Sequence, residues 1–121
     1  MNATIRKPDL KAEFPTSERC WIREVWNDGS DGAVSIARAR VAPGATTQLH
    51  RLRRVDERYL VVEGSGIVRI GTLAPEKVGP GNLVVIPARV AQQKSTDGNI
   101  DLTFYCICMP RFAPGCYEAL E

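Results

Sequence analysis

The most informative part of the chain is residues 43–64, which read PGATTQLHRLRRVDERYLVVEG. Pro43-Gly44 suits a type II turn, because proline presets φ at the first central position and glycine accepts a positive φ at the second. His50 and Leu52 are two residues apart, so on a strand both side chains leave the same face. Glu57 follows five residues after Leu52, before a valine-rich run that ends at Gly64.

Short apolar or alternating runs continue on both sides of this segment, separated by Gly, Pro, Asn and Asp. Such punctuation is typical of a small all-β protein built from short strands. Several strands at this spacing predict a sandwich or a barrel. The expected strands span residues 20–26, 33–41, 47–52, 58–63, 66–72, 83–86, 91–94 and 101–109.

Residues 44–64 resemble the first signature of the cupin superfamily. That signature reads Gly, five residues, His-x-His, three or four residues, Glu, six residues, Gly. In this chain Gly44, His50, Glu57 and Gly64 stand at the required spacings, and Leu52 occupies the place of the second His.

The second cupin signature reads Gly, five residues, Pro-x-Gly, two residues, His, three residues, Asn. Gly81 and Pro87 match it in register. Arg89, Gln92 and Thr96 stand where the signature has Gly, His and Asn. The resemblance therefore has one well-matched motif and one frayed motif, and it covers roughly residues 33–109.

The resemblance implies an all-β cupin barrel, also described as a double-stranded β-helix or jelly roll, over residues 18–112. Residues 1–17 contain Pro8 and Pro15 and are expected to form a short irregular arm. Residues 113–121 are expected to form a tail with one or two helical turns against the barrel.

In metal-bearing cupins the signature positions converge on one divalent ion in the barrel mouth. Here those positions hold His50, Leu52, Glu57 and Gln92. His and Glu suit Fe, Mn, Ni, Cu or Zn, but Leu52 cannot ligate and Gln92 offers only a neutral amide oxygen. His50 is the one histidine in the chain, so no other imidazole fills the gap. The resemblance implies a transition-metal site formed by His50, Glu57 and Gln92, and the depleted set leaves open a pocket without metal.

Three interpretations of His50 remain open. It is a metal ligand, a general acid or base paired with Glu57 in a metal-free pocket, or a structural histidine bonded to Glu57 or Gln92. A carboxylate near the imidazole favours its charged form, so we expect Glu57 to raise the pKa of His50. A His–carboxylate pair in a concave apolar site is suited to acid–base catalysis.

Further residues are expected to bind a ligand. Gln48 and Leu52 share the face of His50, Tyr59 shares the face of Glu57, and Gln92 comes from the other half of the barrel. Arg38 and Arg40 also share one face of their strand. Facing outward they are solvated, and facing inward they favour an anionic ligand such as a carboxylate or phosphate.

Composition narrows the classes of function. Hydrophobic residues make up 44% of the 121 residues and charged residues 25%, with a net charge of +2, which gives no global field for nucleic acid or a membrane surface. No apolar run predicts a transmembrane helix, and the N-terminus lacks the apolar centre of a secretory signal, so a cytoplasmic protein is expected. Cys106 and Cys108, two residues apart, are interpreted as core residues or as a soft-metal or redox pair.

Three functional hypotheses follow. The first is an enzyme of oxygenase, isomerase or lyase type, acting on a small polar or anionic substrate with or without a metal. The second is a non-catalytic ligand-binding cupin, and the third is a structural dimer with a vestigial site. A homodimer is expected in each case, because Leu60 and Val62 point away from Glu57 and would suit a partner.

Overall fold

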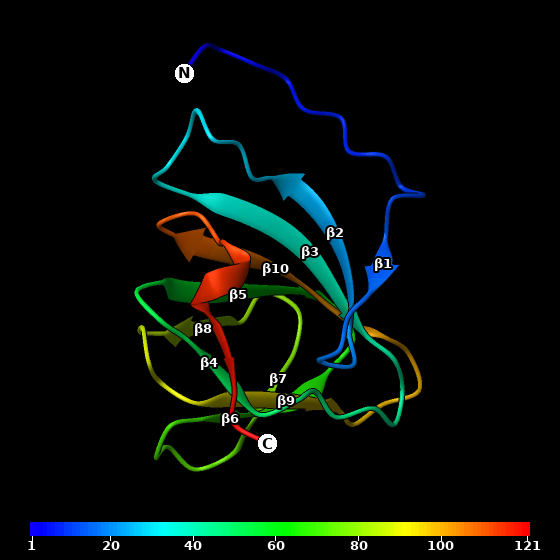
Figure 1. Ribbon diagram of the computed structural model, residues 1–121. Coiled ribbons are helices and arrows are strands. Elements are labelled where there is room, and N and C mark those ends of the chain that lie inside the picture. Colours follow the sequence, from blue (N-terminus) through cyan, green and yellow to red (C-terminus); the bar gives the residue numbers. More distant parts are fainter.

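The alternating runs of the sequence form strands in a computed structural model that describes residues 1–121 (Figure 1). One short 3-10 helix, η1 (Pro114–Cys116), is the sole helical element. No helix is long and apolar enough to span a bilayer. The strands are β1 (Phe14–Pro15), β2 (Trp21–Trp26), β3 (Ser35–Val41), β4 (His50–Leu52), β5 (Asp56–Glu63), β6 (Gly66–Ile70), β7 (Glu76–Val78), β8 (Leu83–Ile86), β9 (Gln92–Thr96), β10 (Leu102–Met109) and β11 (Tyr117–Ala119).

Two antiparallel sheets face each other in Figure 1. The larger sheet has six strands in the order β1-β2-β3-β10-β5-β8, and the smaller has five in the order β11-β4-β9-β6-β7. Neighbouring strands are far apart in sequence, since β10 lies between β3 and β5, and β9 lies between β4 and β6. This is the double-stranded β-helix arrangement, so the predicted cupin fold is confirmed.

The predicted turns form as their sequences require. The amide of Ala45 donates to the carbonyl of Ala42 across Pro43-Gly44, and Asn82 donates to Gly79 across the second Pro-Gly pair, each at 3.0 Å. Gly64 between β5 and β6 has φ +76°, and a Cβ there would lie 2.2 Å from the carbonyl oxygen of Asp101. This position therefore needs glycine for both its conformation and the close backbone approach.

The core lies between the two sheets. Phe104, Ile86, Leu102 and Val41 are each 1% exposed or less, and they come from β3, β8 and β10 of the larger sheet. On β5 the residues Glu57, Tyr59 and Val61 are buried, whereas Leu60 and Val62 are exposed. That alternation, expected from strand geometry, directs Glu57 into the barrel.

Three elements were not expected from the sequence: β1, β7 and β11. The tail was predicted to form one or two helical turns, but only η1 is helical and the residues after it form β11. This last strand pairs with β4, where Ala119 lies opposite His50. Because β4 would otherwise present an unpaired edge, the tail satisfies backbone groups that a helix would leave open.

Candidate functional site

A hollow opens between the sheets at the level of β4 and β5. It has an inner part of about 30 Å³ and an outer part of about 150 Å³. The inner part includes His50, Tyr59 and Lys94 in its lining. Five residues line both parts, which therefore adjoin, and these are Glu18, Ile22, Glu57, Cys106 and Phe112.

The three side chains from the cupin signatures do come together inside the barrel. His50, Glu57 and Gln92 are 3%, 7% and 1% exposed. His50 on β4 lies opposite Gln92 on β9, and Gln92 Nε2 donates to Glu57 Oε1 at 2.9 Å. Leu52 is buried in the same lining. The cupin signatures therefore identified residues that are distant in sequence and close together in the fold.

These residues do not fit a transition metal. No group of three His, Cys, Asp or Glu side chains lies close enough to hold an ion. The carboxylate of Glu57 accepts from Gln92 and, at 3.7 Å, from the thiol of Cys108. Gln92 Oε1 is buried without a partner, but a neutral amide oxygen is a weak donor to such an ion. The ammonium of Lys94 adds a further positive charge to the lining.

The tautomer of His50 is set by its neighbours. Its Nδ1 lies 2.8 Å from the backbone carbonyl oxygen of Gln48, so the neutral ring carries its proton on Nδ1 and donates it to that carbonyl. Nε2 is then a free base. It lies 3.7 Å from Oε2 of Glu18, which is beyond hydrogen-bond length.

Glu57 does raise the pKa of His50, as expected, but the net shift of this pKa is downward. Burial of the imidazole lowers the pKa of His50, and the positive charge of Lys94 lowers it further. Glu18 and Glu57 raise this pKa, but their effects are smaller. His50 is therefore neutral at neutral pH. Its carboxylate neighbour across the gap is Glu18, since Glu57 is engaged by Gln92.

Lys94 is the main site residue that sequence reasoning missed. It is 3% exposed, its Nζ lies 2.9 Å from the hydroxyl of Tyr59, and the ammonium stands 4.5 Å from the centroid of that ring. Burial raises the pKa of Tyr59 well above its usual range, so the phenol stays protonated. A signal existed in the sequence, because Lys94 is two residues after Gln92 on the same strand and must share its face.

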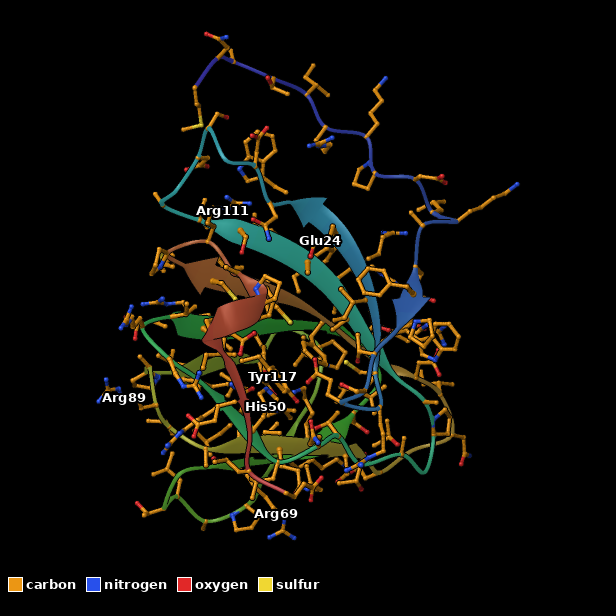
Figure 2. All side chains as sticks on the ribbon, viewed as in Figure 1. Glu24, His50, Arg69, Arg89, Arg111 and Tyr117 are labelled. Atoms are coloured by element: carbon orange, nitrogen blue, oxygen red, sulfur yellow. The ribbon has the colours of Figure 1, made fainter.

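Two more site residues come from the ends of the chain. The ring of Tyr117 on β11 stacks on His50, with centroids 4.7 Å apart and planes 19° apart, and Figure 2 shows the two side by side. The hydroxyl of Tyr117 donates to Gln48 Oε1 at 2.7 Å. Glu18, in the segment before β2, lines both parts of the hollow. No motif marks either residue.

The other predicted ligand-binding residues divide into two groups. Tyr59 lines the hollow, whereas Gln48 supports it from behind by holding His50 and Tyr117. The prediction that Arg38 and Arg40 bind a ligand inside the barrel was wrong. Strand alternation turns Ala39 inward, so both arginines point outward. There they contact Glu13 of the N-terminal segment, and Arg40 also pairs with Asp101 at 3.1 Å.

The paired cysteines on β10 both face the hollow. Burial raises the pKa of Cys106 and of Cys108, and the nearby carboxylate of Glu57 raises both further. Both thiols are therefore protonated and unreactive at neutral pH, which agrees with a packing role.

The chain resembles known proteins in its sequence and in its fold. No protein-family model matches it. The uncharacterized protein MJ1618 of Methanocaldococcus jannaschii is 33% identical over 89 residues, which are 72% of this chain and 69% of that protein.

Solved structures give the fold. Streptomyces Pac13, a nucleoside dehydratase, superposes with a TM-score of 0.78 at 15% identity, covering 98% of this chain and 92% of its own. A Klebsiella pneumoniae protein with a double-stranded β-helix domain gives 0.75 at 13% identity over 92% of both chains. KdgF from Halomonas gives 0.72 at 17% identity, over 83% of this chain and 88% of its own. The sequence match shows that the chain belongs to one family with the Methanocaldococcus protein, and the structural matches show that it has the cupin, or double-stranded β-helix, fold.

Proposed function

We propose that this protein is an enzyme that uses His50 for proton transfer, without a metal, on a small polar substrate held inside the barrel. The reaction class is isomerisation or elimination, the latter being the lyase option. One observation carries the proposal: a buried neutral imidazole presents its unprotonated Nε2 to a hollow that also holds Lys94 and Tyr59.

The surroundings of His50 suit a base. The carbonyl of Gln48 fixes the ring and its tautomer, and the ring of Tyr117 supports one face. A lowered pKa keeps the imidazole unprotonated at neutral pH, so it is ready to accept a proton. Glu18, at 3.7 Å, stabilises the imidazolium that forms after transfer.

The dimensions of the hollow support a small substrate. Its two parts, of about 30 and 150 Å³, are smaller than the roughly 300 to 1,000 Å³ of pockets for drug-sized ligands. Polymers and large cofactors are therefore poor candidates. Pac13, which shares the fold, is a nucleoside dehydratase, and dehydration is an elimination. That likeness supports the reaction class by analogy only.

Oxygenase chemistry receives no support from the donor set, because no three side chains can hold a metal there. The ligand-binding role remains the rival, and it predicts binding without turnover. A homodimer is part of the proposal: exposed apolar side chains gather on the outer face of β5 and β8, where Leu60 lies opposite Leu83. The members of this apolar strip are Leu60, Val62, Leu83 and Val85.

The test is proton exchange in heavy water. Protein treated with EDTA is incubated in D₂O with dihydroxyacetone, glucuronate, malate and uridine as separate probes, and NMR follows the loss of each C–H signal. We expect exchange or water loss with one probe class, abolished in His50→Gln and retained in the surface control Arg69→Gln. Exchange that requires added Zn²⁺, Mn²⁺ or Fe²⁺, or that persists in His50→Gln, contradicts the proposal. Saturable binding without exchange favours the binding role.

A further inference from the structure

We propose that Lys94 and Tyr59 form an oxyanion site for a carbonyl oxygen of the substrate, so that the substrate is a small neutral aldehyde or ketone. This inference rests on the proposed function of His50 and adds the substrate class. It assigns a substrate-binding role to a lysine that no cupin signature position includes.

The hydrogen bonds of Lys94 leave a place for a ligand. An ammonium has three donors, and Nζ uses one of them toward the hydroxyl of Tyr59 at 2.9 Å. No carboxylate lies within ion-pair distance of this amine, although the residue is 3% exposed. Two donors of a buried charge therefore face the hollow without a protein acceptor, which is costly unless an oxygen completes them.

The rings around the amine fix its position. It stands 4.5 Å from the centroid of Tyr59 and 5.4 Å from that of Phe104. These two rings lie 4.6 Å apart and support the aliphatic stem and the charge together. The ammonium is thus a fixed point charge rather than a mobile surface group.

The volume of the hollow limits what reaches Lys94. The inner part, about 30 Å³, is much smaller than the outer part, about 150 Å³. It suits a small group, such as a single oxygen atom, beside the amine. The rest of a ligand lies in the outer part, whose lining includes Ile22, Ala37 and Phe112. The shape therefore suits one oxygen on a compact, largely apolar body.

The charges favour a neutral carbonyl over a carboxylate. Glu18 and Glu57 line both parts of the hollow, and each repels a ligand that is anionic before it reacts. A ketone meets no such repulsion, and its oxygen gains negative charge only during the reaction, when Lys94 stabilises it most.

The chemical step balances without an external reagent. Nε2 of His50 takes the proton from the carbon next to the carbonyl, and the C–H electron pair forms a C=C bond. The carbonyl π electrons move to the oxygen, which becomes an enolate oxyanion beside the ammonium of Lys94 and the hydroxyl of Tyr59. Return of the proton to the enolate gives exchange or isomerisation. In elimination the enolate re-forms the C=O bond, a C=C bond forms to the next carbon, and the leaving group departs from that carbon with its electron pair and takes the proton from the imidazolium of His50.

The experiment uses cyclopentanone labelled with ¹³C at its carbonyl carbon. NMR titration of the purified full chain gives the dissociation constant and the carbonyl chemical shift, and in D₂O it also gives exchange of the α-protons. We expect a downfield carbonyl shift on binding, because the ammonium polarises the C=O bond. In Lys94→Met the downfield shift disappears and binding weakens about tenfold, the loss typical of a hydrogen bond to a charged group. The surface control Lys77→Met, whose side chain is 70% exposed, retains both.

Two further variants separate the inference from the proposed function. His50→Gln should lose α-proton exchange and keep the downfield carbonyl shift; persistent exchange there contradicts the role of His50 and leaves the oxygen site standing. Equal shifts and affinities in wild type and Lys94→Met overturn the oxyanion site, as does absence of the shift in wild type. If circular dichroism shows that Lys94→Met is unfolded, Tyr59→Phe decides: a smaller shift and weaker binding support the site, and unchanged values overturn it.

Discussion

Acidification of the protein from pH 7.5 to pH 5 tests the environment assigned to His50. Because the pKa of His50 is below its ordinary value of 6.5 in the folded state, the unfolded chain binds more protons between the two values. The free energy of unfolding therefore rises with pH in that window. The contribution is complete above pH 6.5, declines as pH falls below 6.5, and levels off below the folded pKa.

The number of histidines limits how strongly His50 can change the free energy of unfolding with pH. The chain has one, so at most one proton is involved, and the slope cannot exceed about 1.4 kcal/mol per pH unit. For a domain of this length that corresponds to roughly 4 to 6 °C in melting temperature per pH unit. The same loss should be absent from His50→Gln, which lacks the imidazole, whereas Glu24, whose pKa is raised by burial, is present in both proteins and cancels in the comparison.

Urea unfolding at half-unit steps of pH, for wild type and His50→Gln, measures the difference directly. Hydrogen bonds from Arg40 and Arg51 lower the pKa values of Glu13 and Glu118, so these carboxylates titrate below this window and cancel in the comparison. Parallel curves for the two proteins refute the reasoning, and so does a wild type that becomes more stable on acidification. The proton resonances of the single imidazole give a second reading, and in Lys94→Met they should titrate at higher pH, since the second cause of the lowered pKa is gone.

Three other outcomes are expected. Gly64→Ala should destabilise the fold by about 2 kcal/mol or more in guanidinium unfolding, because the new Cβ would clash at 2.2 Å and the backbone there is left-handed. Gly32→Ala has open space around its new Cβ, so it should change the free energy of unfolding by less than about 1 kcal/mol. Tyr117→Ala should slow His50-dependent exchange more than Tyr117→Phe does, since only the phenylalanine keeps the stacked ring; equal rates would argue against positioning by that ring. In analytical ultracentrifugation the wild type should sediment as a dimer and Leu83→Glu as a monomer, with Leu73→Glu, also exposed, unchanged; a monomeric wild type would remove the dimer from the proposal.

Part of this architecture was predictable because strand alternation and turn chemistry are local. The Pro-Gly turns follow from the φ preferences of proline and glycine, and the strand Leu83–Ile86 follows from a short apolar run. The inward direction of Glu57 came from the register of the first family motif. The meeting of His50 with Gln92 came from the spacing of the family motifs. Tertiary pairing of the chain ends has no such local signature, so the strand that carries Tyr117 was missed.

The sign of the pKa shift of His50 failed for a related reason. The expectation that a nearby carboxylate raises the pKa of His50 was correct, and both Glu57 and Glu18 do so. Burial of the imidazole and the charge of Lys94 outweigh them, and the second of these causes cannot be anticipated until the position of Lys94 is known. Its spacing from Gln92 places it on the inward face of the strand, but lysine is seldom buried, so the residue type gives no reason to look for it there.

The residues at the cupin signature positions and the buried lysine both leave the site without the charge pattern that a metal ion needs. A histidine at position 92 would present a lone pair to a metal, whereas Gln92 presents an N–H to the carboxylate of Glu57 and so stabilises its charge without an ion. Leu52 contributes no donor atom. Lys94 then supplies one fixed positive charge to a lining that holds two carboxylates, and a divalent cation in the same space would be repelled by it. A pocket arranged in this way polarises a substrate oxygen with an ammonium, which is the role that a Lewis acid serves in metal-dependent enolisation.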